Sequence, residues 1–227
     1  MAVTDEAILK IKEMLLAGEL RPGDRLPPEK ELSERLGLSR SSLREAVKAL
    51  EVIRVLDVRR GDGTYVTSLE PRLLLEAIGF VVDLHHDGTI LELFEVRRIL
   101  EPAAAALATR RATREALAEL GALVAAVDPH TSVENLVEHD LAFHRRIADL
   151  SGNSYLSGIL DQLSSSTHRA RIWRGLTEAG AVGRTLEEHQ AILDAMLTGD
   201  SDLVRSRLTT HIAGVETWLA RAAERPA

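Results

Sequence analysis

The chain has 227 residues, 45% of them hydrophobic, which is enough for two compact domains or one large one. No segment approaches the roughly 18 uninterrupted apolar residues of a membrane span, no cysteine is available for disulfides or thiolate chemistry, and the N-terminus lacks a secretory signal. We therefore expect a cytoplasmic protein. The net charge of −7 does not exclude a nucleic-acid partner, because residues 1–67 hold 12 Lys and Arg against 12 Asp and Glu.

The first part of the chain predicts three helices followed by a hairpin. Apolar residues recur at helical spacing in three segments, 4–17, 29–37 and 38–51. The stretch "VLDVRRGDGTYVTS" then carries two short β-branched runs around an Asp-Gly turn, which is typical of a hairpin. This order predicts a winged helix-turn-helix domain over residues 1–67, followed by a linker over 68–73.

The beginning of the third helix is the part that a helix-turn-helix protein places against base edges in the major groove. Arg40 and Arg44 lie one turn apart there, and the planar fork of arginine matches O6 and N7 of guanine. We predict DNA contacts from this helix, from the preceding one and from the hairpin tip, by Lys30, Ser39, Arg40, Ser41, Ser42, Arg44, Arg59, Arg60 and Gly61. The alternative is a solvated basic face on a protein-interaction domain.

The ordered motifs "RPGDRLPPEKELSERLGLSRSSLREAVKALE" and "VRRGDGTYV" resemble the N-terminal domain of the GntR family of bacterial transcription regulators. The resemblance implies binding to a double-stranded DNA operator, with contacts by Lys30, Arg40, Ser41, Ser42, Arg44 and Gly61. Two positions depart from the family pattern. Lys30 stands where arginine is usual, which argues against a bidentate contact. Ile53 and Arg54 replace a Gly-Leu-type turn, so we expect a different start to the hairpin.

Beyond the linker the sequence predicts helices almost throughout and no strand. Gly, Asn and Asp-Pro breaks separate seven expected helices, 72–85, 89–111, 113–127, 132–151, 154–175, 183–198 and 201–223. The fold class is therefore mostly α, with the winged helix-turn-helix followed by an all-α helical bundle over residues 74–227.

Four polar side chains fall on the apolar faces of these helices. Asp140 and His144 lie four residues apart on one apolar stripe, and His189 and His211 lie on the stripes of two later helices. A single inward histidine is usually a satisfied core residue, but burying several unpaired polar groups costs on the order of a few kcal/mol each. A divalent metal removes that cost by taking one lone pair from each. We expect zinc first, although nickel, manganese or iron would suit the same donors.

A further polar pair falls on helix 89–111, at the inner face or its edge. Arg97 and Glu101 are spaced to pair with each other at i,i+4. The alternative is that Arg97 lines a pocket and holds a carboxylate by two hydrogen bonds.

The motifs "LFEVRRILEPAAAALA", "HDLAFH" and "SGNSYL", with the two later histidines, resemble the FCD ligand-binding domain that follows GntR heads in FadR-type regulators. The resemblance implies homodimers, a small carboxylate effector contacted by Arg97, and a metal held by Asp140, His144, His189 and His211. We expect that effector to be a hydroxy, keto or sugar acid.

These features predict a sequence-specific transcription regulator, a repressor rather than an enzyme, controlled by a small acid near a metal. Two alternatives stay open. A metal-dependent enzyme acting on a small acid is one, because three histidines and an aspartate can also activate water. A regulator with a purely structural metal is the other. Four protein ligands without a nearby dedicated base favour sensing or structure over catalysis.

Overall fold

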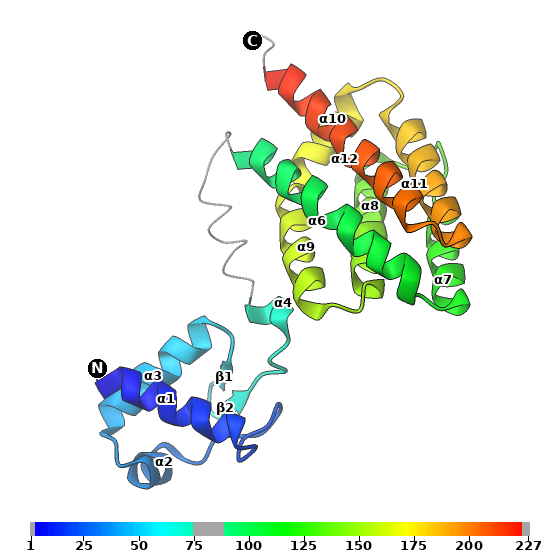
Figure 1. Ribbon diagram of the computed structural model, residues 1–227. Coiled ribbons are helices and arrows are strands. Elements are labelled where there is room, and N and C mark those ends of the chain that lie inside the picture. The colour runs from blue at the N-terminus through cyan, green and yellow to red at the C-terminus, as the bar shows by residue number, and fades with distance from the viewer. Residues whose placement is uncertain (1–2, 75–88, 224–227) are drawn as a thin grey trace. The chain divides into compact units, whose positions relative to one another are not determined.

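The computed structural model describes residues 3–74 and 89–223, and the chain divides into two compact units that are treated separately below (Figure 1). The predicted fold class is confirmed, because one unit is a winged helix-turn-helix and the other is built from helices. Within the described ranges, no helix is both long enough and apolar enough to cross a membrane.

The N-terminal unit contains three helices and a two-stranded sheet, in the predicted order. These are α1 (Val3–Leu16), α2 (Glu29–Leu36), α3 (Arg40–Val52), β1 (Leu56–Arg59) and β2 (Gly63–Val66). The strands pair antiparallel, with Leu56 opposite Val66, and both of these side chains are buried. They complete a core to which α1 contributes Ile11 and α3 contributes Leu43. The packing of α1 on α3 leaves the beginning of α3 at the surface.

Left-handed residues end α2 and α3. Gly37 follows α2 with φ +65°, and Arg54 occupies the corresponding position after α3 with φ +61°. The N–H of Arg54 donates to the carbonyl of Glu51, and the N–H of Val55 donates to the carbonyl of Leu50. These two hydrogen bonds define a type of helix end at which the left-handed residue is usually glycine. The expected difference at the start of the hairpin is therefore one of residue type, while the backbone keeps the glycine-type turn.

The C-terminal unit is all-α in the part that the structure describes. Its helices are α6 (Thr89–Arg111), α7 (Arg114–Val124), α8 (Val133–Leu150), α9 (Ser154–Ser166), α10 (His168–Thr177), α11 (Ala181–Thr198) and α12 (Ser201–Ala223). The long helices α6 and α12 pack along each other, and α8 lies against α6 (Figure 1). Phe94, Phe143 and Leu208 from these three helices are almost fully buried in the shared core.

The segment between the two units matches the predictions only in part. A short helix, α4 (Pro71–Leu74), begins inside the linker predicted over 68–73. The helix predicted over 72–85 overlaps α4, and its remainder lies outside the described residues.

The prediction of one helix over 154–175 is wrong, because α9 and α10 are separate helices that meet at Thr167. Four consecutive hydroxyl residues end α9. The hydroxyls of Ser165 and Ser166 donate to carbonyls one turn back, and Thr167 Oγ1 donates to the carbonyl of Ser164. Such bonds compete with the regular helix ladder. After the break, α10 is a separate helix on which Arg171 and Arg174 are buried.

We predict opposite stability effects at the two left-handed helix ends. Gly37→Ala should destabilise the N-terminal unit by about 1 kcal/mol, because a Cβ disfavours this backbone conformation. The cost should come from the backbone alone, since a Cβ at Gly37 meets nothing within 4 Å. Arg54→Gly should stabilise the unit by about 0.5–1 kcal/mol. Hydrogen exchange of the α1 and α3 amides measures both effects, and a loss of protection in Arg54→Gly would contradict the prediction.

Candidate metal centre and nucleic-acid interface

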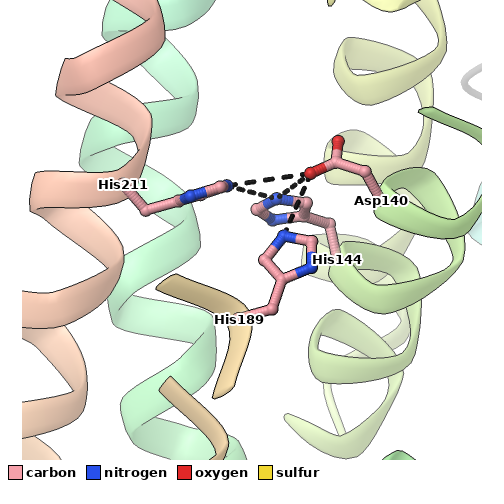
Figure 2. Close-up of side chains that lie close together, drawn as sticks. All are labelled: Asp140, His144, His189 and His211. Atoms are coloured by element: carbon pink, nitrogen blue, oxygen red, sulfur yellow. Dashed lines mark hydrogen bonds and ion pairs between the residues drawn. The ribbon is translucent and has the colours of Figure 1, made fainter. Parts of the chain in front are cut away.

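The four polar residues predicted on apolar helix faces come together in the C-terminal unit. Asp140 and His144 come from α8, His189 from α11 and His211 from α12, and all four are buried. One candidate ligand atom from each lies within 4.8 Å of all the others. Figure 2 shows the three imidazoles and the carboxylate directed toward one point, with Asp140 and His144 on the same helix and each of the other two histidines on a helix of its own.

The distances identify the atoms that face this point. Asp140 Oδ1 lies 3.1 Å from His189 Nε2 and 3.5 Å from His144 Nε2. His211 Nε2 lies 3.2 Å from His144 Nε2 and 3.7 Å from Asp140 Oδ1. Every histidine thus presents Nε2 and the aspartate presents Oδ1. Three nitrogens and one oxygen form the donor set.

Two carboxylates outside the cluster contact the other ring nitrogens. His144 Nδ1 lies 2.6 Å from Glu101 Oε2, and His211 Nδ1 lies 2.7 Å from Glu188 Oε2. A carboxylate at Nδ1 favours the tautomer that carries its proton there, which leaves a lone pair on Nε2. In that tautomer two lone pairs face each other across 3.2 Å, beside a carboxylate oxygen. A cation satisfies this arrangement, so the residues fit a divalent metal.

The protonation states of Asp140 and His189 suit metal binding. Burial would raise the pKa of Asp140, but the charge of Arg171 and contacts with histidine hold that pKa well below its ordinary value. Burial lowers the pKa of His189 to about 3 and keeps the ring neutral. Burial would also lower the pKa of His211, yet the nearby carboxylates of Asp140 and Glu188 raise it above its ordinary value. An ionised carboxylate and a neutral imidazole are the forms that ligate metals, so metal binding at His211 would displace a proton from that ring.

A small cavity of about 40 Å³ lies beside the cluster. Its polar lining includes Arg97, Asp140, His144, Arg171, Arg174 and Thr185. Arg97 Nε donates to Glu101 Oε1 at 2.5 Å, and Arg97 Nη1 donates to Thr167 Oγ1 at 3.2 Å. Arg97 therefore pairs with Glu101 and also lines the cavity, while its contact with an effector carboxylate stays a prediction.

Three charged residues around the cluster had not been predicted. Arg171 is buried on α10 and donates to Asp140 Oδ2, Arg174 is buried one turn further along, and Glu188 on α11 contacts His211. Arg171 and Arg174 share a helix face at i,i+3 spacing, but this spacing alone does not indicate that the face is buried. Glu188 directly precedes His189, and the sequence alone gives no sign that it faces another histidine.

The residues predicted to contact DNA lie at the surface of the N-terminal unit. Ser39 caps α3, with its hydroxyl accepting from the N–H of Ser42 at 3.1 Å, as its position before the helix predicted. Arg40 begins α3 and is exposed, as are Ser41 and Arg44. Of the nine residues predicted to contact DNA, eight are exposed and Ser42 is half-buried.

Local contacts orient several of these side chains. Arg44 Nε donates to Glu29 Oε2 at 2.8 Å. Lys30, which follows Glu29 on α2, is exposed. In the hairpin, Arg59 Nε donates to Asp57 Oδ2 at 2.9 Å, and its guanidinium lies 4.2 Å from the centre of the Tyr65 ring. The remaining tip residues, Arg60 and Gly61, are exposed, and Gly61 turns the chain with φ +77°. These exposed residues stay accessible to a phosphate or base.

Comparison with known proteins confirms both resemblances. A family model described as bacterial regulatory proteins, gntR family, matches residues 3–66, and one described as FCD domain matches residues 92–214. The chain is 30% identical to the HTH-type transcriptional regulator LutR of Bacillus subtilis (strain 168), over 91% of this chain and 96% of that protein. It is also 30% identical to the galactonate operon transcriptional repressor of Escherichia coli (strain K12), over 92% of this chain and 93% of that protein. The solved structure of Streptococcus agalactiae GntR is 28% identical, with a TM-score of 0.74, and covers 95% of this chain and 99% of that one.

We predict that the cluster binds one divalent metal and that removing the metal destabilises the C-terminal unit. With free metal at 100 times its Kd, the stabilisation should be about 2.7 kcal/mol. His189→Ala should abolish both stoichiometric metal content and the loss of thermal stability on adding a chelator. The exposed His130 provides the matched control, because His130→Ala should retain both. Full metal content in His189→Ala would contradict the assignment.

Proposed function

The chain belongs to the GntR family of bacterial regulatory proteins and carries an FCD domain, so it is a transcription regulator, and on this premise we propose that it is a metabolite-controlled repressor. In this proposal a homodimer binds a double-stranded DNA operator through its N-terminal units. A small carboxylate metabolite, bound at or beside a metal in the C-terminal unit, controls the operator affinity. The similar galactonate operon repressor supports repression as the mode of control.

The exposed beginning of α3 supports the assignment of the DNA-binding surface. Arg40 and Arg44 lie one turn apart on α3, within reach of the same groove. Ser41 and Ser42 beside them, with Lys30 on α2, suit phosphate contacts. The hairpin residues Arg59, Arg60 and Gly61 would add contacts beside the recognition helix. Two such heads on a dimer would read two half-sites related by two-fold symmetry.

The convergence of Asp140, His144, His189 and His211 beside a cavity lined by arginines carries the effector part of the proposal. These four residues would hold the metal, with zinc as the first expectation and nickel, manganese or iron as alternatives. The bound metal would supply positive charge, and Arg97 would supply directional hydrogen bonds to a carboxylate. An acid with different affinities for two head arrangements shifts their populations and thereby changes operator binding.

Of the two alternatives to this proposal, only one is supported by an observation. The metal-dependent enzyme is not supported, because the related proteins and the similar solved structure are transcription regulators. A regulator with a purely structural metal is the second candidate. It is favoured by the way the ligands would tie α8, α11 and α12 together. Under that candidate, no acid would change operator affinity.

We predict that Arg40→Ala and Arg44→Ala each abolish specific operator binding and leave the fold intact, because each removes a base contact worth about 1–3 kcal/mol together with a positive charge. Lys12→Ala is the control, since Lys12 is exposed on α1 and carries the same charge outside the predicted surface. Fluorescence anisotropy with operator and scrambled DNA measures the effect. Wild-type affinity in both arginine variants would exclude the assigned DNA-binding surface.

We predict that a thermal-shift screen of hydroxy, keto and sugar acids yields ligands whose stabilisation disappears with chelator. The same ligands should change operator affinity, and Arg97→Ala should weaken both responses because it removes a charged donor from the cavity. Arg110→Ala on the exposed end of α6 is the control. If no acid alters melting temperature or operator affinity, the structural-metal candidate replaces this proposal.

A further inference from the structure

Arg171 is a buried arginine in the cavity lining, and one nitrogen of its guanidinium group has no hydrogen-bond acceptor in the part of the chain that the structure describes. It is 7% exposed, and Nη1 donates to Asp140 Oδ2. Its Nη2 is buried and has no hydrogen-bond acceptor among the described residues. Arg97 differs, because Glu101 and Thr167 accept two of its donors. An unpaired buried donor on a charged group is costly, so the geometry indicates an acceptor supplied from outside the protein.

The position of Arg171 connects the cavity with the candidate metal ligands. Asp140 presents Oδ2 to Arg171 and Oδ1 to His189, so the two sides of one carboxylate face different partners. Arg171 lines the cavity as well. A ligand that accepts from Nη2 would therefore lie one side chain away from Asp140.

The balance of charge indicates that this ligand is an anion. Arg97 and Arg171 offset Glu101 and Asp140 within the buried group. Arg174, which is also buried in the cavity lining, is offset by Glu178. A divalent metal adds two positive charges, and Glu188, whose side chain is 32% exposed, offsets at most one of them. A singly charged anion in the cavity restores the balance that a low-dielectric interior requires.

The size of the cavity favours a compact anion. Its volume of about 40 Å³ is room for about three water molecules. The carbon chain of a six-carbon sugar acid would have to displace the side chains that line the cavity. An acid of two or three carbons would displace them much less.

We propose that Arg171 binds the carboxylate of a two- or three-carbon 2-hydroxy or 2-keto acid and couples its binding to that of the metal through Asp140. This inference rests on the proposed function and makes it more specific, because it names the residue and the size class of the acid. Coupling is reciprocal, so the metal should raise the affinity for the acid, and the acid should raise the affinity for the metal by the same factor.

Isothermal titration calorimetry on the full chain, with and without one equivalent of Zn²⁺, tests the proposal with glycolate, pyruvate, gluconate and inorganic phosphate. Arg171→Lys keeps the charge beside Asp140 but lacks the second arm of the guanidinium. It should retain the metal and bind glycolate and pyruvate about tenfold or more weakly. The same substitution at the exposed Arg169, on the same helix, should leave the affinity within about twofold of wild type.

Several results would overturn the inference and leave the proposed function standing. These are wild-type acid affinity in Arg171→Lys, tighter binding of gluconate or phosphate than of the short acids, and equal affinity with and without metal. Loss of metal from Arg171→Lys would also overturn it, since Arg171 would then only hold Asp140 in place. If no acid binds to the wild type, the proposed function fails as well.

Discussion

Three imidazole nitrogens and one carboxylate oxygen meet in the interior of the C-terminal unit, and their lone pairs converge there. Such a group is unfavourable in an apolar core unless a positive charge lies among its members. Glu101 and Glu188 strengthen this constraint, because their carboxylates favour protons on the outer ring nitrogens and leave the inner nitrogens as acceptors. A shared cation, as proposed above, would give the helices that contribute these residues a favourable arrangement.

The same constraint relates metal binding to the proposed sensing of an acid. Asp140 is shared between the histidine cluster and Arg171, and Glu101 is shared between His144 and Arg97. Each arginine thus reaches the cluster through a carboxylate that also contacts a histidine. A change in charge at one side of these carboxylates alters the electrostatic energy at the other. An acid in the cavity and a metal among the histidines would therefore affect each other without direct contact.

Much of this arrangement could be predicted from local sequence patterns. The helix caps, the Asp-Gly turn and the helical spacing of Asp140, His144, His189 and His211 depend on residues near one another in sequence. The break at Thr167 could not be predicted, because serine and threonine also occur within helices and only the structure shows which carbonyls accept from their hydroxyls. Arg171 and Glu188 were missed for a related reason. Their partners lie on other helices, so their role depends on tertiary packing.

X-ray absorption spectroscopy at the metal edge of the purified, zinc-loaded chain tests the proposed metal site directly. The four ligands predict a first shell with three imidazole nitrogens and a carboxylate oxygen at about 2.0–2.2 Å, with the multiple scattering that imidazole rings produce. His189→Ala should remove one imidazole from that shell if any metal remains. A shell made of oxygen alone, or one with fewer than three imidazoles in the wild type, would contradict a metal site formed by Asp140, His144, His189 and His211.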